Sequence, residues 1–154
     1  MSWDWAWGFV NLVAVLGWAA LILLPRRPTT HSLILYAGVG LLCLTYAIIV
    51  VLLVGHLADP GQAAGQGPAD LSDYSIAGIR RLFGSDGGVV LGWTHYLAFD
   101  LFIGLWIGRD ADHKGFSRLV QAPVLLLTFL AGPLGLLVWL LIRERRARRA
   151  AASA

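Results

Sequence analysis

The sequence predicts an all-α fold: a polytopic integral membrane protein whose single domain is a bundle of four membrane-spanning helices. The 154-residue chain is 58% hydrophobic and only 14% charged, and its mean hydropathy is +0.71. An ordinary soluble domain carries about 25% charged residues. The hydrophobic residues gather in four runs, at 3–24, 33–57, 89–108 and 119–142. Each run has roughly the 20 residues that a helix needs to cross a bilayer.

The first run is expected to be a retained membrane span rather than a cleaved leader. It carries Asp4 and no Lys or Arg at its start, and a Pro-Arg-Arg-Pro turn follows it where a cleavable signal has small residues. No Arg- and Ser-rich transit segment precedes it. These features favour a bacterial cytoplasmic membrane as the location.

The charges between the runs predict the orientation. An even number of spans puts both termini and the connection 58–88 on one side, which carries seven of the 12 Lys and Arg residues against five on the other. The positive-inside rule therefore predicts that both termini are cytoplasmic. Five tryptophans are expected at the interface on that same side, where amphipathic rings prefer to lie: Trp3, Trp5, Trp7, Trp93 and Trp139.

The connection 58–88 changes composition twice. Residues 58–70 are rich in Gly, Pro and Ala and are predicted to form a linker. After it, Ser72 or Asp70 is expected to cap a short amphipathic helix whose apolar residues recur at near-helical spacing. These apolar residues are Ile76, Ile79, Leu82 and Phe83. We expect this segment to lie in the membrane interface, with a lid over a cavity between the spans as the alternative.

The stretch WTHYLAFDLFIG, residues 93–104, places an aspartate inside the third hydrophobic run. At about 1.5 Å per residue from Val89, His95 lies roughly 9 Å and Asp100 roughly 16 Å into the membrane. A carboxylate near the bilayer centre costs about 2.5 to 3.5 kcal/mol on insertion scales, and such a group is by default a candidate functional residue. The alternative is that a protonated Asp100 links helices by a hydrogen bond. Its expected partners are Thr45, Tyr46 and Thr128.

His95 and Asp100 are predicted to point in different directions. Five residues along a helix separate two side chains by about 140°, so the two cannot form a His-Asp pair within the third span. Asp100 shares a face with Tyr96, and His95 shares one with Phe99. The spacing argues against a Ser-His-Asp relay but is compatible with two groups lining one cavity from two sides.

The fourth run contains a proline at about the depth of Asp100. Pro133 removes a backbone hydrogen bond and clashes with the carbonyl of Phe129, which predicts a kink and a freed carbonyl. Gly132 and Gly135 allow a neighbouring helix to approach closely. This segment is predicted to be either a packing notch or the wall of a cavity beside Asp100.

The remaining motifs predict no cofactor. The sequence has no Walker loop, dinucleotide fingerprint, HExxH motif or nucleophile elbow. Asp110, Asp112 and His113 lie in a short hydrophilic turn where such clusters are usually solvated, so no metal is predicted there. The net charge of +3 requires no nucleic-acid partner. The basic tail, 143–154, is expected to anchor the topology or to contact anionic membrane lipids, and the oligomeric state is not assigned.

The motifs AGIRRLF, GWTHYLAFDLFIG, GRDAD and AGPLG, all within about the last 85 residues, resemble those of the ABA4-like membrane proteins. This family was formerly a domain of unknown function, and its plant member is required for making neoxanthin from violaxanthin. Members often carry an arginine shortly after the Asp-Leu-Phe, where this chain has Leu105. The positions that match the family pattern are Trp93, His95, Asp100, Leu101, Phe102, Asp110, Gly132, Pro133 and Gly135.

The resemblance implies chemistry on a carotenoid or another isoprenoid lipid, and therefore an isomerase. Opening an epoxide to an allenic alcohol needs an acid and a base, roles that Asp100 and His95 could fill. The expected contacts with the polyene end-group are Trp93, Tyr96, Phe99, Phe102, Trp18, Tyr46, Phe129 and Pro133. The alternative is a non-catalytic membrane protein that binds such a lipid or scaffolds the enzymes that modify it, and a small transporter is a distant third.

Overall fold

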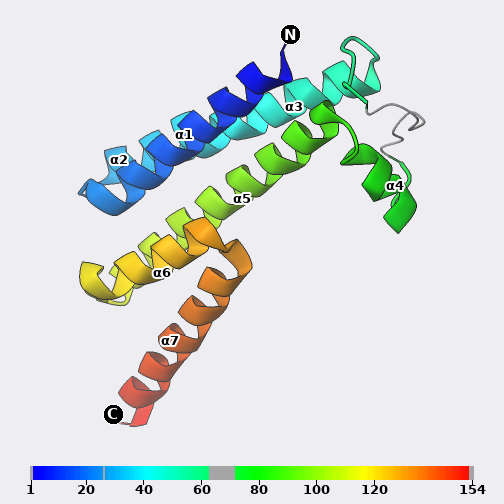
Figure 1. The fold of residues 1–154 in the computed structure, drawn as a ribbon. Coiled ribbons are helices and arrows are strands. Elements are labelled where there is room, and N and C mark those ends of the chain that lie inside the picture. The colour runs from blue at the N-terminus through cyan, green and yellow to red at the C-terminus, as the bar shows by residue number, and fades with distance from the viewer. Residues whose placement is uncertain (1, 26, 63–71, 153–154) are drawn as a thin grey trace.

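The computed structural model describes residues 2–25, 27–62 and 72–152, the last eight by their backbone alone (Figure 1). Every named secondary-structure element is a helix. The helices are α1 (Trp3–Leu23), α2 (Pro28–Leu33), the π-helix η1 (Ile34–Gly40), α3 (Leu41–Val54), α4 (Ile76–Leu82), α5 (Asp86–His113), α6 (Arg118–Leu130) and α7 (Gly132–Ala152).

Three of the described helices are long and apolar enough to cross a membrane. They are Trp3–Leu23, the continuous helix Pro28–Val54 that α2, η1 and α3 form together, and Asp86–His113. These helices coincide with the first three predicted spans, as expected of a membrane protein. The middle one passes through a π-helical segment, which is an uncommon geometry found mostly at special sites within helices.

The helix α5 forms the centre of the bundle and packs against α1, α3, α6 and α7. Two small residues allow the closest approach between α1 and α5. A Cβ added to Gly17 would lie 2.6 Å from the Leu101 side chain, and one added to Gly104 would lie 2.4 Å from the Trp18 ring. Both Leu101 and Trp18 are buried, so large side chains of each helix fill gaps left by glycines of the other.

Local hydrogen bonds begin α4 and α5. Gly78 N donates to Ser75 Oγ over 3.0 Å, and Gly88 N donates to Ser85 Oγ over 3.1 Å. The predicted Ser72 cap for the short helix is therefore wrong, because Ser75 satisfies the first turn; Asp70, the alternative cap, lies outside the described residues. Most of the predicted linker, 58–70, also lies outside them.

The segment before α4 is tied to it by charge as well as by its cap. The Ser75 N–H donates to Asp73 Oδ1 over 3.0 Å, and Arg81 forms an ion pair with the same carboxylate. The hydrogen bonds from Ser75, and then the Arg81 guanidinium, lower the pKa of Asp73. These contacts lie within one short segment, which projects from the end of the bundle (Figure 1).

The predicted fourth span, 119–142, is wrong as a single helix. The helix α6 ends at Leu130, Ala131 has φ −154° and ψ 70°, and α7 begins at Gly132. The physical reason is Pro133. Inside one continuous helix it would break a hydrogen bond and clash with a carbonyl, whereas in the first turn of a new helix its missing N–H costs nothing.

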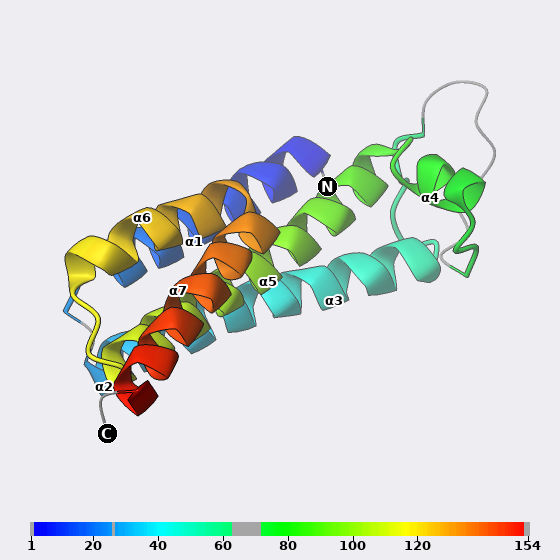
Figure 2. The same cartoon turned by 90° about the horizontal axis from the view of Figure 1, so that it is seen from below.

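The two helices α6 and α7 form a hairpin that returns to the end where α6 began (Figures 1 and 2). At the start of α6, Gln121 donates to Asp112 near the end of α5. At the turn, Gly132 lies against Asp100, in the middle of α5. Further along α7, Trp139 again reaches the end of α5, at Asp110. Therefore α7 runs parallel to α5.

This hairpin changes two predictions about the ends of the bundle. The chain begins at the end beside α4, and α7 runs toward the opposite end, beside α2 (Figure 2). The two termini therefore do not share one end. Trp139 is fully buried against Asp110, so the prediction that it lies at an interface with Trp3 is wrong. A count of apolar residues along a segment cannot distinguish a helix that crosses the membrane once from a hairpin that enters it and turns back half-way.

The hairpin predicts that Gly135→Ala destabilises the protein. A Cβ at Gly135 would lie 2.1 Å from Thr128 Oγ1 and 2.4 Å from the Thr128 backbone nitrogen, so α6 and α7 would have to separate. Overpacking of this kind costs about 1–3 kcal/mol. We expect a lower midpoint of thermal unfolding in detergent.

The matched control is Gly8→Ala in α1, where an added Cβ meets nothing within 4 Å. We expect its midpoint to equal or exceed that of the parent, because alanine favours helix more than glycine does. Equal midpoints for the two variants would contradict the close contact between α6 and α7.

Candidate functional site

Asp100 lies in the middle of α5 against the first residue of α7. Its exposed fraction is 8%, and a Cβ built on Gly132 would lie 2.0 Å from Asp100 Oδ1. Only glycine therefore leaves room for the carboxyl group at this place. The start of a helix carries partial positive charge from its free N–H groups, so the break between α6 and α7 gives the buried acid a favourable position.

Tyr96, one turn before Asp100, completes this arrangement. The Tyr96 hydroxyl lies beside both the Asp100 carboxyl group and the Gly132 N–H, close enough to interact with each. The second carboxyl oxygen, Oδ2, is buried without a hydrogen-bond partner among the described residues. The predicted shared face of Tyr96 and Asp100 is confirmed, and one acceptor of the acid is left available.

The three residues predicted to link Asp100 to another helix by a hydrogen bond make other contacts instead. Thr45 Oγ1 donates to the Leu41 carbonyl, and Thr128 Oγ1 donates to the Val124 carbonyl, each over 2.8 Å. These hydroxyl groups bond to their own helices, as threonines in helices often do. The Tyr46 ring lies near His95 instead.

His95 lies on a different side of α5 from Asp100, as the spacing predicted. Its ring stacks on Phe99 with a centroid distance of 4.6 Å, and the Tyr46 ring of α3 lies 5.7 Å away. His95 and Phe99 are both exposed. The structure therefore does not bring the predicted acid and the predicted base together.

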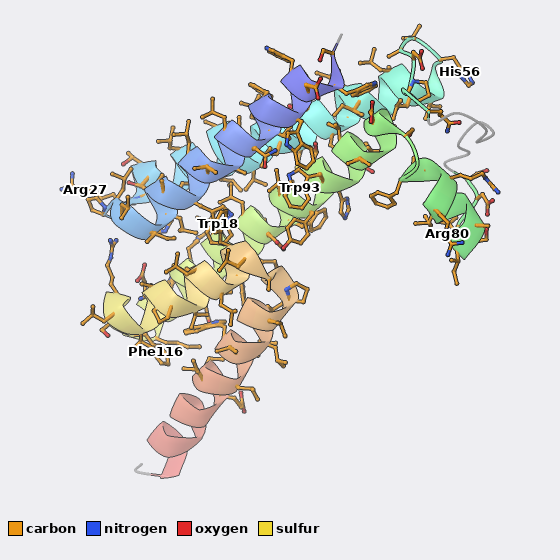
Figure 3. The ribbon with its side chains drawn as sticks, viewed as in Figure 1. Trp18, Arg27, His56, Arg80, Trp93 and Phe116 are labelled. Carbon is orange, nitrogen blue, oxygen red and sulfur yellow. The ribbon has the colours of Figure 1, made fainter. Side chains whose placement is uncertain are left out.

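Trp93 connects the site to α1 (Figure 3). Its Nε1 donates to Asn11 Oδ1 over 3.1 Å, and Asn11 Nδ2 donates to the Trp7 carbonyl over 2.8 Å. The Trp93 ring stacks on both Trp7 and Tyr96, with centroid distances of 5.3 Å. Asn11 thus helps to position the ring that supports Tyr96. The prediction missed it, although a lone amide inside an apolar run is a detectable signal.

The other aromatic residues predicted to contact a ligand fall into two groups. Trp18 and Phe129 pack edge to face at 5.5 Å, and Trp18 is buried in the core. Phe99 and Phe102 face outward with exposed fractions of 57% and 46%. Pro133 is exposed at the start of α7. These residues do not surround a single space.

Asp110 ties α7 to α5 a second time. Its Oδ2 accepts hydrogen bonds from Trp139 Nε1 over 3.0 Å and from Arg143 Nε over 2.9 Å. Lys114 lies 3.5 Å from its Oδ1. The Arg143 guanidinium also lies 5.7 Å from the centre of the Trp106 ring. Asp110 was predicted to be solvated in a turn; it is instead ion-paired within α5, and the hairpin brings two of its partners, Trp139 and Arg143, near.

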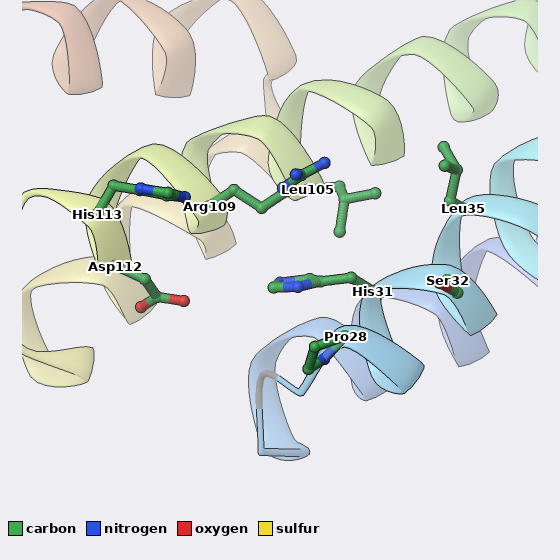
Figure 4. Close-up of a pocket in the computed structure, with 8 residues that line it drawn as sticks. All are labelled: Pro28, His31, Ser32, Leu35, Leu105, Arg109, Asp112 and His113. Atoms are coloured by element: carbon green, nitrogen blue, oxygen red, sulfur yellow. The ribbon is translucent and has the colours of Figure 1, made fainter.

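Two adjoining clefts open at the end of the bundle where α2 begins and α5 ends. The larger one, of about 420 Å³, is lined by Pro28, His31, Ser32, Leu35, Leu105, Arg109, Asp112 and His113 (Figure 4). The second, of about 280 Å³, is lined by Leu35, Phe102, Leu105, Trp106, Arg109, Asp110 and His113. Neither cleft includes Asp100. Within the described part of the chain, no group of three His, Cys, Asp or Glu side chains is arranged to hold a metal ion.

The structure has three membrane-length helices, and α5, which the others surround, carries the buried carboxyl group of Asp100. These features define a multi-pass helical membrane protein. The chain belongs to the ABA4-like family: the family model described as ABA DEFICIENT 4-like matches residues 5–139. That range runs from α1 to Trp139, so the likeness first seen in the last 85 residues extends to nearly the whole chain. No curated protein and no solved structure matches the chain.

The contacts of Asp110 predict that Asp110→Asn destabilises the protein. Asparagine can still accept from Trp139 but loses the charge that pairs with Arg143. Hydrogen bonds to charged groups contribute about 1.5–3 kcal/mol, so we expect the free energy of unfolding to fall by roughly that amount. Urea unfolding in mild detergent, followed by tryptophan fluorescence, measures it.

The control is Asp4→Asn, at an exposed position in the first turn of α1, for which we expect a change within about 0.5 kcal/mol. An Asp110→Asn protein as stable as this control would show that the ion pair with Arg143 contributes nothing.

Proposed function

We propose that the protein binds a carotenoid or a related isoprenoid inside the bilayer and isomerises it with Asp100 as the reacting acid. The observation that supports this most directly is the buried carboxyl group whose Oδ2 has no partner among the described residues. An ionisable residue at this depth is costly and is therefore a functional candidate by default. Membership of the ABA4-like family agrees with the substrate class.

A stripe of rings on α5 offers a binding surface for the polyene. His95, Phe99, Phe102 and Trp106 are all exposed and recur at intervals of four, three and four residues, so they share one face of α5. The stripe is about 16 Å long. An isoprenoid dissolved in the bilayer reaches it laterally, and a flat conjugated chain can pack against stacked rings.

The reaction class we propose opens an epoxide to an allenic alcohol. The epoxide oxygen gains a proton as its C–O bond breaks, and a nearby C–H bond loses a proton, so neither an oxidant nor a reductant is needed. A carboxyl group can do both, because one oxygen donates its proton while the other accepts the proton from carbon. In this scheme a hydrogen bond donated by the neighbouring Tyr96 hydroxyl orients Asp100.

The role of His95 differs from the one that the sequence suggested. His95 stacks on Phe99 and lies on another side of α5 from Asp100, so the two side chains are not paired as acid and base. We therefore assign His95 to the ring stripe that contacts the polyene. A bifunctional Asp100 replaces the earlier pair of acid and base.

A non-catalytic function is the second candidate. Asp100 lies against the start of α7 and beside Tyr96, an arrangement that also stabilises a helix start. In that case the ring stripe binds the lipid, or presents it to another enzyme, without changing its chemistry.

Replacing Asp100 by asparagine tests the catalytic proposal. The parent and Asp100→Asn are expressed in a carotenoid-producing bacterial host, and the extracted pigments are separated by chromatography. We expect a new isomeric pigment with the parent and at least about a hundredfold less of it with the variant, because acid–base catalysis contributes 10²–10⁴-fold.

Asp4→Asn serves as the control, and size-exclusion chromatography in detergent shows that each protein is folded. Asparagine retains the shape and can still accept a hydrogen bond. Undiminished product with Asp100→Asn would refute the role of the acid. Unchanged pigments with the parent itself would instead support the binding function.

We also propose that the chain crosses the membrane three times and that its C-terminus is cytoplasmic and its N-terminus external. The end of the bundle toward which α7 runs carries Arg27, Arg109, Lys114, Arg118, Arg143 and the four further arginines of α7. The opposite end carries only Arg80 and Arg81 among the described residues. Nine cations against two is a decisive bias under the positive-inside rule. The four-span topology predicted from the sequence placed seven Lys and Arg residues on one side and five on the other.

Cysteine labelling tests this topology, since Cys43 is the only cysteine and can first be changed by Cys43→Ala. We expect an impermeant maleimide to label Ser2→Cys in intact cells and Glu144→Cys only after permeabilisation. Labelling of both from the same side would refute the hairpin, and the reversed pattern would refute the orientation.

A further inference from the structure

The larger cleft lies at the ends of two membrane-length helices, a position at which lipid headgroups are expected. It opens between the first turn of α2, at Pro28, and the last turn of α5, at His113, and these are the ends of two membrane-length helices. Its apolar lining residues include Leu35 and Leu105, which also line the second cleft. The pair of clefts therefore forms a continuous surface that is polar at one end and apolar at the other.

The polar end combines groups of both charges. Arg109 supplies a permanent cation, and the imidazoles of His31 and His113 can each donate a hydrogen bond. Asp112 supplies an anion in the same cleft, and its Oδ1 accepts from Gln121 Nε2 over 2.9 Å. Figure 4 shows His31 of α2 and Asp112 of α5 pointing toward one another across the opening. Such a mixed lining suits a headgroup that itself carries both charges.

We propose that this cleft binds a zwitterionic phospholipid whose headgroup has a phosphate and a primary ammonium group. The phosphate contacts the Arg109 guanidinium, which binds phosphate strongly, and the ammonium contacts the Asp112 carboxylate. An acyl chain extends along the second cleft, over Phe102 and Trp106. Basic pockets at the ends of membrane helices commonly bind lipid headgroups.

The carboxylate selects among phospholipids. It repels a headgroup that is only anionic, and a primary ammonium can donate hydrogen bonds to it. A quaternary ammonium has no hydrogen to donate and favours aromatic faces instead. The cleft therefore distinguishes phosphatidylethanolamine from phosphatidylglycerol and from phosphatidylcholine.

This site stands independently of the isomerase proposal, because Asp100 and His95 line neither cleft. The lipid need not react. It fills the space between α2 and the end of α5, so it also fixes the position of the adjoining end of the ring stripe at Trp106.

The test uses the full-length protein purified in detergent and the three phospholipids with identical acyl chains. Native mass spectrometry gives the fraction bound and the dissociation constant of each. We expect phosphatidylethanolamine to bind about tenfold more tightly than either other lipid, since a charge-assisted hydrogen bond corresponds to about that factor.

Two substitutions separate the two contacts. Arg109→Gln should raise the dissociation constants of all three lipids by about tenfold. Asp112→Asn keeps an oxygen that can accept from Gln121 and should remove only the preference for phosphatidylethanolamine over phosphatidylglycerol. The control is Arg118→Gln, which lies at the same end of the bundle outside both clefts and should change neither, and thermal unfolding shows that each variant is folded.

Equal binding of the three lipids by the parent would overturn the proposal. So would an unchanged preference in Asp112→Asn. Inorganic phosphate that displaces the lipid at millimolar concentration would show a site for free phosphate, which also overturns the lipid assignment. Retained phosphatidylethanolamine preference in Asp100→Asn would show that the site does not depend on the proposed catalytic acid.

Discussion

The contact between Asp100 and the start of α7 is the constraint on which the rest of this structure depends. A helix that stops and restarts within a bilayer leaves polar backbone groups that lipid cannot satisfy, so the break must be enclosed by protein. Here Gly132 lies against the Asp100 carboxyl group, and the Tyr96 hydroxyl lies beside both. The carboxyl group and the N-terminal end of α7 therefore enclose one another, and the helix dipole is favourable for the polar group placed there.

The second aspartate makes this arrangement a two-point attachment. Asp100 and Asp110 are about 15 Å apart along α5, and they meet α7 at Gly132 and at Trp139 and Arg143. Two attachments along parallel helices fix both position and direction, which explains why α7 runs beside α5 rather than away from it. The proline at the second position of α7 then costs no hydrogen bond.

Two faces of α5 have different roles. One face holds Tyr96 and Asp100 against α7 and is buried, while another presents rings to the surroundings. The chemistry proposed for Asp100 and the surface proposed for a polyene are thus supplied by one helix. The cleft at its end, which we propose binds a lipid, continues the same stripe to Arg109 and His113. Trp93 and Asn11 hold the buried face in place from α1.

The sequence by itself determined what depends on neighbouring residues. Hydrophobic runs predicted the first three membrane-length helices, the five-residue spacing separated His95 from Asp100, and Pro133 predicted a kink in the fourth segment. Helical period, span length and proline geometry are local properties. The tertiary structure alone decided that the chain turns back at Ala131, and that Arg143 and Trp139 meet Asp110. It also decided that His31 and Asp112, far apart in sequence, line one cleft. A hydrophobic run looks the same whether it crosses the bilayer or returns half-way, because hydropathy records burial in an apolar medium and carries no information about direction.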